Sequence, residues 1–161
     1  MPSFDVVSKT DINEVDNAVN GVKRETQQRF DLKGTKCGIE RSENTLTITA
    51  DDKLKLGQMH DLLRTYFARR ELDAKALDFG TPEDATGDSL RQTVTIKQGI
   101  DGDLARKIVK AVKGAKIKVQ LAVQGDELRV SAKKRDELQE TITFIKDMDL
   151  ELPLQYTNFR E

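Results

Sequence analysis

The sequence contains no tryptophan, and its 161 residues include only one cysteine, one histidine and three prolines. With Cys37 as the single cysteine, an intramolecular disulfide and a zinc site built from cysteines alone are excluded. No second histidine accompanies His60, so this residue is expected to pack at a partly buried or surface position. No glycine-rich phosphate loop of the Walker or Rossmann type is present. We therefore expect no enzymatic activity and no cofactor.

Long apolar runs are also missing, since no stretch approaches the roughly 20 residues that a membrane span requires. The first residues lack the basic, apolar and small-residue succession of a signal peptide. These absences predict a cytoplasmic protein without a membrane partner. The net charge is −1, from 27 basic and 28 acidic side chains. Such a chain has no molecule-wide field that attracts nucleic acid, so any anion must bind at a local patch.

What the chain does contain is an internal repeat of alternating apolar residues followed by a helical pattern. A constant offset relates Leu46, Ile48, Ala50 and Leu56 to Leu128, Val130, Ala132 and Leu138. Period-2 alternation indicates strands, and capping residues before an apolar stripe with helical spacing indicate helices. In the first half we expect strands at 3–8, 36–41, 46–50 and 71–79, with helices starting near residues 11 and 52. In the second half we expect strands at 90–98, 116–123, 128–130 and 153–157, with helices starting at 101 and near 131–133.

Each half therefore has the order β-α-β-β-α-β, the ferredoxin-like or RRM-like plan. The predicted class is α+β, with two domains that each place two helices on one face of a four-stranded antiparallel sheet. The expected boundaries are 1–79 for the first domain, 80–89 for a polar linker and 90–161 for the second domain. The strand at Met1–Ser8 can instead complete the sheet of the other half, and the sequence leaves both pairings open.

Basic residues cluster around the expected start of the last helix. Lys133, Lys134 and Arg135 fall in its predicted first turn, where the helix dipole favours carboxylates. Lys116 and Lys118 lie on the adjacent predicted strand. Together with free backbone amides at the helix start, these cations form a candidate phosphate site. The alternative is an ordinary solvated face, neutralised by neighbouring acidic side chains.

An RNA-binding domain of this plan stacks bases on aromatic residues of its sheet, which can be checked in the sequence. The outward positions of the third strand in each half are Thr45, Thr47 and Thr49, and Glu127, Arg129 and Ser131. None of these residues is aromatic, so recognition of bases by stacking is not expected. A threonine-rich, basic sheet face remains able to contact phosphates.

Several sequence blocks, spread over the whole chain, carry a resemblance to a known family. They include Met1-Pro-Ser-Phe-Asp5, Arg29-Phe-Asp-Leu-Lys-Gly34, Lys133-Lys-Arg-Asp-Glu-Leu-Gln139 and Pro153-Leu-Gln-Tyr-Thr-Asn-Phe-Arg160. These blocks are similar to the YajQ family of bacterial proteins. The resemblance implies two ferredoxin-like domains and nucleotide binding, with no established enzymatic activity. It further implies a ligand such as cyclic di-GMP, GTP or ATP, and for some relatives a downstream action on a transcription factor or DNA.

Our leading hypothesis is a non-catalytic, cytoplasmic regulator that binds a guanine nucleotide or cyclic di-GMP. The alternative is an adaptor that binds RNA, DNA or a protein through an electrostatic patch. No oligomeric state is predicted. The candidate ligand residues are first Lys116, Lys118, Lys133, Lys134 and Arg135, and then Lys33 and Arg160. Phe30 or Phe159 is expected to stack on a guanine, the alternative for both being packing against the core or as a lid.

Overall fold

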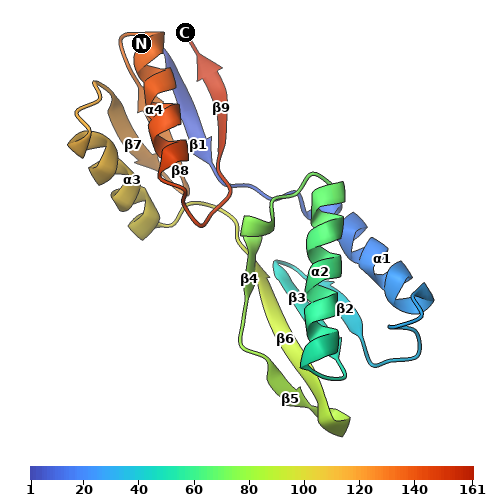
Figure 1. The fold of residues 1–161 in the computed structure, drawn as a ribbon. Helices are drawn as coiled ribbons and strands as arrows, with labels where there is room; N and C mark the ends of the chain where they lie inside the picture. Colours follow the sequence, from blue (N-terminus) through green and yellow to red (C-terminus); the bar gives the residue numbers. More distant parts are fainter. The chain divides into compact units, whose positions relative to one another are not determined.

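The computed structural model describes residues 1–161, which form two compact units (Figure 1). The terminal unit consists of Met1–Lys9 and Gln98–Glu161, and the inserted unit is Thr10–Lys97. Both units combine antiparallel sheets with helices, so the expected α+β, ferredoxin-like class is confirmed. None of the helices combines the length and the apolar character that a membrane crossing requires.

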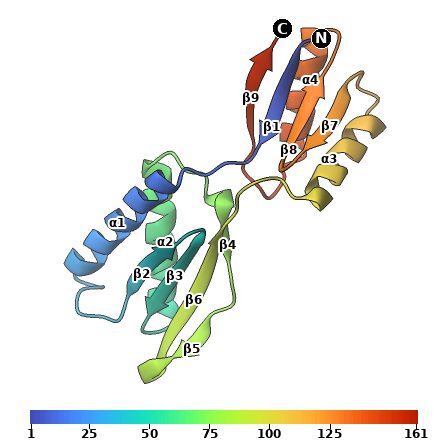
Figure 2. The same cartoon turned by 180° about the vertical axis from the view of Figure 1, so that it is seen from behind.

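The terminal unit has four strands and two helices. Its elements are β1 (Ser3–Val7), α3 (Gly102–Gly114), β7 (Gln120–Gln124), β8 (Glu127–Ser131), α4 (Arg135–Asp147) and β9 (Gln155–Arg160). The strands follow the order β7-β8-β1-β9, and every neighbouring pair is antiparallel. Both helices cover the same face of the sheet, as the two opposite views show (Figures 1 and 2).

The core of the terminal unit lies between this sheet and its helices. Phe4 of β1 is paired with Val130 of β8, and both side chains are fully buried. Ile108 of α3 and Ile145 of α4 cover them from the helical layer. The alternation of apolar residues along β1 and β8 thus meets one stripe of each helix, the arrangement that the sequence pattern predicts.

The inserted unit has the same plan with one additional short strand. Its elements are α1 (Ile12–Gln28), β2 (Gly38–Ser42), β3 (Thr45–Ala50), α2 (Lys53–Arg69), the 3₁₀ helix η1 (Ala74–Ala76), β4 (Leu77–Phe79), β5 (Glu83–Ala85), the 3₁₀ helix η2 (Thr86–Asp88) and β6 (Ser89–Ile96). The main strand order is β2-β3-β6-β4, and β5 also pairs with β6. The two helices pack on one face over a separate core centred on Ile48, Leu63 and Phe67.

The first strand of each repeat lies in the sheet of the other repeat. β1 pairs with β8 and β9 of the terminal unit, although the whole inserted unit follows it in the chain. β6 fills the corresponding central position of the inserted unit, between β3 and β4. This is the second of the two pairings that the sequence left open. The chain consequently crosses between the units twice, and the Thr10 hydroxyl donates to the Lys97 carbonyl, 3.5 Å away, where it leaves and returns.

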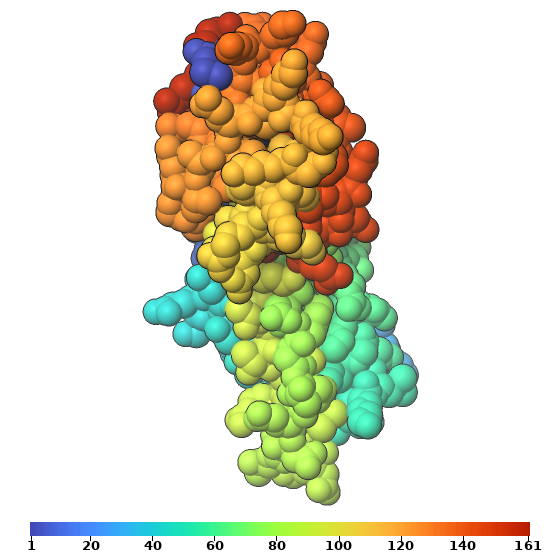
Figure 3. Space-filling model, turned by 90° about the vertical axis from the view of Figure 1, so that its left-hand side faces the viewer, coloured from blue at the N-terminus to red at the C-terminus, as the bar shows by residue number.

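The structure therefore differs from the expected boundaries at 1–79, 80–89 and 90–161. The segment at 80–89 is not a linker, because β5 pairs with Arg91, Leu90 and Ser89 of β6. The Lys36 ammonium donates to the Gly87 carbonyl at 2.6 Å, which further ties the segment to the inserted unit. Figure 3 shows these residues, in lime green, at the surface of that unit. An edge strand with solvent beside it has no apolar alternation, which explains its resemblance to a linker.

Three predicted element limits are also corrected. The strand expected at 71–79 is confined to Leu77–Phe79 and follows η1. The strand expected at 116–123 starts only at Gln120, because Lys116 adopts a left-handed φ of 59° in the turn after α3. The last helix begins at Arg135, so its first turn carries Asp136 and Glu137. These carboxylates suit the helix dipole, so the conflict that the sequence suggested is confined to Arg135, the first residue of the helix.

The exchanged strands make a specific prediction about fragments of the chain. A fragment of residues 10–97 contains a complete sheet and core, so we expect it to unfold cooperatively in a urea titration followed by circular dichroism. A fragment of residues 90–161 lacks β1, the central strand of its sheet, and is expected to show no cooperative transition. The opposite result would contradict the observed strand exchange.

The packing of α1 on α2 depends on Gly21. A Cβ added at this position would lie 2.3 Å from ring carbons of Tyr66, so the ring occupies the space that a side chain would need. Gly57 of α2 has no such neighbour within 4 Å. Glycine at residue 21 allows the two helices to approach closely, although glycine has a low helix propensity.

We expect Gly21→Ala to destabilise the protein by about 1–3 kcal/mol, because Tyr66 must move out of its packed position. The matched control Gly57→Ala is expected to stabilise by roughly 0.5–1 kcal/mol, since it only removes the backbone entropy cost of glycine. Both values come from urea unfolding of the full chain. Equal effects of the two substitutions would show that the Tyr66 contact has no energetic weight.

Candidate functional site

A hollow of about 370 Å³ lies at one end of the terminal unit, between the start of α4 and the ends of β1 and β9. We call it the β9–α4 hollow. Its lining is Pro2, Ser3, Arg135, Asp136, Leu138, Gln139, Ile142, Phe159, Arg160 and Glu161. Three of the residues expected from the sequence to contact a nucleotide, Arg135, Phe159 and Arg160, are thus brought together.

Strand register explains why residues distant in sequence meet at this end. Ser3 of β1 pairs with Ser131 at the end of β8 and with Arg160 at the end of β9. α4 begins at Arg135, shortly after β8 ends. Antiparallel pairing therefore places the start of α4 and the last residues of β9 around the first residues of the chain.

The exposed ring of Phe159 is held by a bulge in β9. The register with β1 shifts between Ser3 and Asp5, and Asn158 adopts a left-handed φ of 58° there. The bulge turns Phe159 toward the core side, where its ring stacks on Phe4 with centroids 5.5 Å apart. Phe159 remains 61% exposed, so one face packs on the core while the rest borders the hollow. Packing and ligand stacking are compatible in this position.

Positive and negative side chains balance in the β9–α4 hollow. Arg135 forms an ion pair with Glu161, and Asp136 also lines the hollow. Arg160 donates through Nε to the Asn158 side-chain oxygen, 3.4 Å away. An incoming phosphate would therefore compete with the Glu161 carboxylate for Arg135. Glu161 was not anticipated from the sequence, because pairing between the start of α4 and the residue that follows β9 requires the fold.

The start of α4 adds backbone donors to the same region. Lys134 occupies the N-cap position and has no side-chain acceptor, so no side chain caps the first amides of the helix. Such amides attract anions because they point along the positive end of the helix dipole. Together, the two arginines, the aromatic ring and these amides provide the types of group that bind a nucleotide.

The four lysines expected to share this site lie outside the hollow. Lys133 and Lys134 are exposed residues that precede α4. Lys116 and Lys118 are exposed in the segment before β7, which corrects their expected position on a strand. Since Gln120 pairs with Ser131, Lys118 lies at the same end of the sheet as Arg160. Three strand spacings, about 14 Å, separate β7 from β9 across the sheet.

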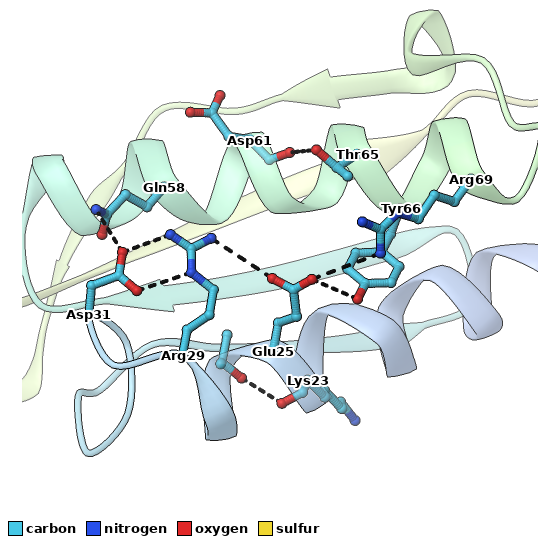
Figure 4. Close-up of polar contacts among 10 residues, drawn as sticks. Lys23, Glu25, Arg29, Asp31, Gln58, Asp61, Thr65, Tyr66 and Arg69 are labelled. Atoms are coloured by element: carbon cyan, nitrogen blue, oxygen red, sulfur yellow. Dashed lines mark hydrogen bonds and ion pairs between the residues drawn. The ribbon is translucent and has the colours of Figure 1, made fainter.

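The remaining two predicted residues, Phe30 and Lys33, belong to the inserted unit. Phe30 is 98% exposed in the loop that follows α1, and Lys33 is also exposed there. The residues on either side of Phe30 are fixed, because Arg29 donates twice to the Asp31 carboxylate at 3.0 and 2.7 Å. Figure 4 shows this pair and its contact with Gln58 of α2. The packing alternative for Phe30 is wrong.

A buried carboxylate connects three strands of the terminal unit. Asp5 of β1 accepts from Arg129 of β8 at 3.0 Å and from Asn158 of β9 at 2.7 Å. The hydrogen bond from Arg129 holds the pKa of Asp5 below its usual value, while burial opposes this shift. The network lies on the sheet face opposite the helices. Through Asn158 it also reaches Arg160, so it helps to orient one wall of the hollow.

The outward positions of the two third strands carry the polar residues expected from the sequence. Thr45, Thr47 and Thr49 are partly exposed while Leu46 and Ile48 are buried, and β8 shows the same alternation. The sheet faces therefore offer no aromatic platform on these strands. His60 is half-buried, bonds to Gln92 and packs 4.5 Å from the Phe79 ring. No group of three or more histidine, cysteine or acidic residues is arranged to hold a metal ion.

A second hollow, of about 320 Å³, lies between α1 and α2 of the inserted unit. Its lining is Asn17, Asn20, Arg24, Tyr66, Arg69 and Arg70. Sequence analysis missed it, although the spacing of these residues on two amphipathic helices contains a signal. Positions three and four apart lie on one helix face. What the sequence does not reveal is that the two polar faces meet.

Fold and site together describe a protein with two ferredoxin-like units and, in the terminal unit, a hollow lined by two arginines, two carboxylates and an aromatic ring. The chain matches the family described as "Nucleotide-binding protein YajQ-like" over residues 2–160. It is 58% identical to a nucleotide-binding protein of Rhodospirillum centenum, 57% to one of Parvibaculum lavamentivorans and 56% to one of Paramagnetospirillum magneticum. Each alignment covers the whole of both chains. The chain belongs to the YajQ-like family of nucleotide-binding proteins.

The Asp5 network predicts a specific dependence of stability on pH. Because folding lowers the pKa of Asp5, its ionised carboxylate stabilises the fold fully at pH values above the pKa of Asp5 in the unfolded chain. This stabilisation is lost as the pH falls through the pKa of Asp5 in the folded protein. We expect Asp5→Asn to reduce the free energy of unfolding at pH 7 by about 1.5–3 kcal/mol. The variant should also lose stability less steeply than the native protein below about pH 4.

Urea unfolding between pH 3 and 7 measures both effects. Asp103→Asn provides the control, because this carboxylate is 92% exposed and pairs only within α3. It is expected to leave the stability profile almost unchanged. Parallel pH profiles for Asp5→Asn and the native protein would show that the network does not stabilise the fold.

Proposed function

We propose that the protein is a non-catalytic, cytoplasmic regulator that binds a guanine nucleotide or cyclic di-GMP in the β9–α4 hollow. The observation that carries the proposal is the meeting of Arg135, Arg160 and Phe159 in one hollow. Family membership supports nucleotide binding as such. The choice of a guanine ligand rests on the resemblance of the sequence blocks to this family.

In this proposal, different residues contact different parts of the nucleotide. The guanidinium groups of Arg135 and Arg160 contact phosphate oxygens, and their planar donors suit bidentate recognition. Phe159 stacks on the base with its exposed face, while Phe4 supports the ring from behind. The first amides of α4 add hydrogen bonds to a phosphate. Lys133 and Lys134, close to the helix start, raise the local positive potential without direct contact.

Glu161 regulates access to Arg135 in this scheme. In the free protein its carboxylate neutralises the arginine, and a ligand phosphate takes its place. The exchange replaces one ion pair by another, so the favourable free energy comes from the additional contacts of Arg160, Phe159 and the helix amides. Nothing in this arrangement requires a bond of the nucleotide to be broken, in keeping with a binding role.

Isothermal titration of the full chain with cyclic di-GMP, GTP and ATP, at low and moderate salt, tests the proposal. We expect one-site binding of a guanine ligand, and about tenfold or greater loss of affinity for Arg135→Gln and for Arg160→Gln. Glu161→Gln is expected to increase affinity because it removes the competing carboxylate. Arg106→Gln is the control, since this exposed arginine of α3 pairs locally with Asp103. Unchanged affinity in the Arg135→Gln, Arg160→Gln double variant would refute the site.

A second candidate function is that of an adaptor for a nucleic acid or protein. The observation that favours it is Phe30, almost fully exposed on a turn fixed by the Arg29–Asp31 pair. An exposed aromatic ring on an ordered turn contacts a partner at little entropic cost. Absence of nucleotide binding, combined with retention of RNA that disappears at moderate salt, would favour this function.

A further inference from the structure

The hollow between α1 and α2 concentrates arginine side chains on the surface of the inserted unit. Its volume of about 320 Å³ is lined by Arg24 of α1, Arg69 of α2 and the C-cap residue Arg70, together with Asn17, Asn20 and Tyr66. We call it the arginine hollow. Residues 17, 20 and 24 fall on one face of α1, and residues 66, 69 and 70 on one face of α2. Packing of the two helices brings these faces together.

The positive charge of the arginine hollow is only partly neutralised. Arg70 makes a bidentate ion pair with Glu14, at 2.7 and 3.0 Å. Arg69 lies 3.9 Å from the Glu25 carboxylate, at the limit of an ion pair. Arg24 forms no ion pair. Three guanidinium groups therefore face two carboxylates, and the excess positive charge attracts an anion to the hollow.

The cations are also held in place before any ligand arrives. The Tyr66 ring lies against Gly21, and its hydroxyl donates to Glu25 at 2.8 Å. The Arg69 guanidinium lies over this ring, 4.8 Å from its centroid. Figure 4 shows Glu25 between Tyr66 and Arg69 on one side and Arg29 on the other. Because Arg69 has already lost side-chain freedom, an anion that contacts it requires little further ordering.

An ordinary structural explanation accounts for only part of this cluster. Arg69 lies in the last turn of α2, and Arg70 is its C-cap, where cations stabilise the helix dipole. Arg24 and the two asparagines lie on α1 before its last turn, which carries no basic residue. The helix dipole therefore accounts for Arg69 and Arg70. It does not account for Arg24 and the two asparagines of α1, which form the opposite wall of the hollow.

We propose that the arginine hollow binds the phosphate groups of a small phosphorylated anion, at a site separate from the β9–α4 hollow. Guanidinium donors match the oxygens of a phosphate in pairs, and the Asn20 amide supplies a further donor. The volume exceeds that of several water molecules, so it accommodates two linked phosphates. The proposal does not rest on the nucleotide function of the terminal unit.

Isothermal titration of the full chain with pyrophosphate at low salt tests this site. We expect saturable binding, and about tenfold weaker affinity for Arg24→Gln, because this arginine has no other partner whose loss would disturb the fold. Arg64→Gln is the matched control on α2, since Arg64 does not line the hollow and pairs with Asp61. Its affinity should equal that of the native protein. Thermal unfolding of each variant reports that the fold is intact.

A variant that binds pyrophosphate more tightly would distinguish a binding role of these arginines from a purely structural one. Glu14→Gln releases Arg70 and removes a negative charge beside the hollow, so pyrophosphate should bind several-fold more tightly. A structural role alone would not produce this increase. Adenosine and its 5′-monophosphate form a further pair of probes, of which only the phosphorylated one is expected to compete with pyrophosphate.

Several outcomes would overturn the assignment. Absence of pyrophosphate binding by the native protein, or equal losses in Arg24→Gln and Arg64→Gln, would show that the hollow has no specific anion site. Loss of binding in Arg135→Gln together with full retention in Arg24→Gln would assign the anion to the β9–α4 hollow. That last result would leave the proposed nucleotide function in place, so the two proposals fail independently.

Discussion

The carboxylate of Asp5 is the group on which the arrangement of the chain most depends. It lies in the central strand of the terminal unit, and its side chain is 8% exposed. Its two partners, Arg129 and Asn158, are 124 and 153 residues away in the sequence. In the inserted unit, the corresponding position of β6 is Thr93, paired with Thr47 of β3. If β1 and β6 changed places, Asp5 would face a threonine and Arg129 would lose its carboxylate. Because an unpaired buried charge is costly, this pair favours the exchanged arrangement.

Much of the fold follows from local patterns, whereas the exchange does not. Alternating buried residues identify both β1 and β6 as strands, with Phe4 and Val6 on the buried face of β1 and Gln92 and Val94 at the corresponding positions of β6. The alternation of apolar and polar residues indicates which face of a strand is buried, but it does not indicate which strand lies beside it. The observed pairing is accompanied by polar contacts between segments far apart in the sequence. The segment at 80–89 was misassigned for a related reason, because an exposed edge strand and a linker share a polar composition.

The candidate site was predictable to a similar degree. The cluster of cations near the predicted helix start pointed to Arg135, and the last block of the family resemblance pointed to Phe159 and Arg160; the structure brings these three residues together. The lysines named with them lie outside, because the turn after α3 and the late start of α4 displace them. The counter-ion Glu161 could not be inferred, since its pairing with Arg135 joins two elements that only the tertiary structure brings together. Local sequence thus indicates the type of ligand more readily than the balance of charges around it.

The double crossing of the chain has a consequence for its synthesis. β1 leaves the ribosome before the inserted unit and its partners β8 and β9 leave after it, so the terminal sheet cannot form until β9 has been translated. During this time the inserted unit has all the residues that it needs. Once it has folded, Thr10 and Lys97 are hydrogen-bonded neighbours, and the long intervening segment has become a closed loop. Folding of the inserted unit therefore already covers most of the entropic cost of closing the loop between β1 and the rest of its sheet. Contacts that are very distant in sequence can then form as though they were local.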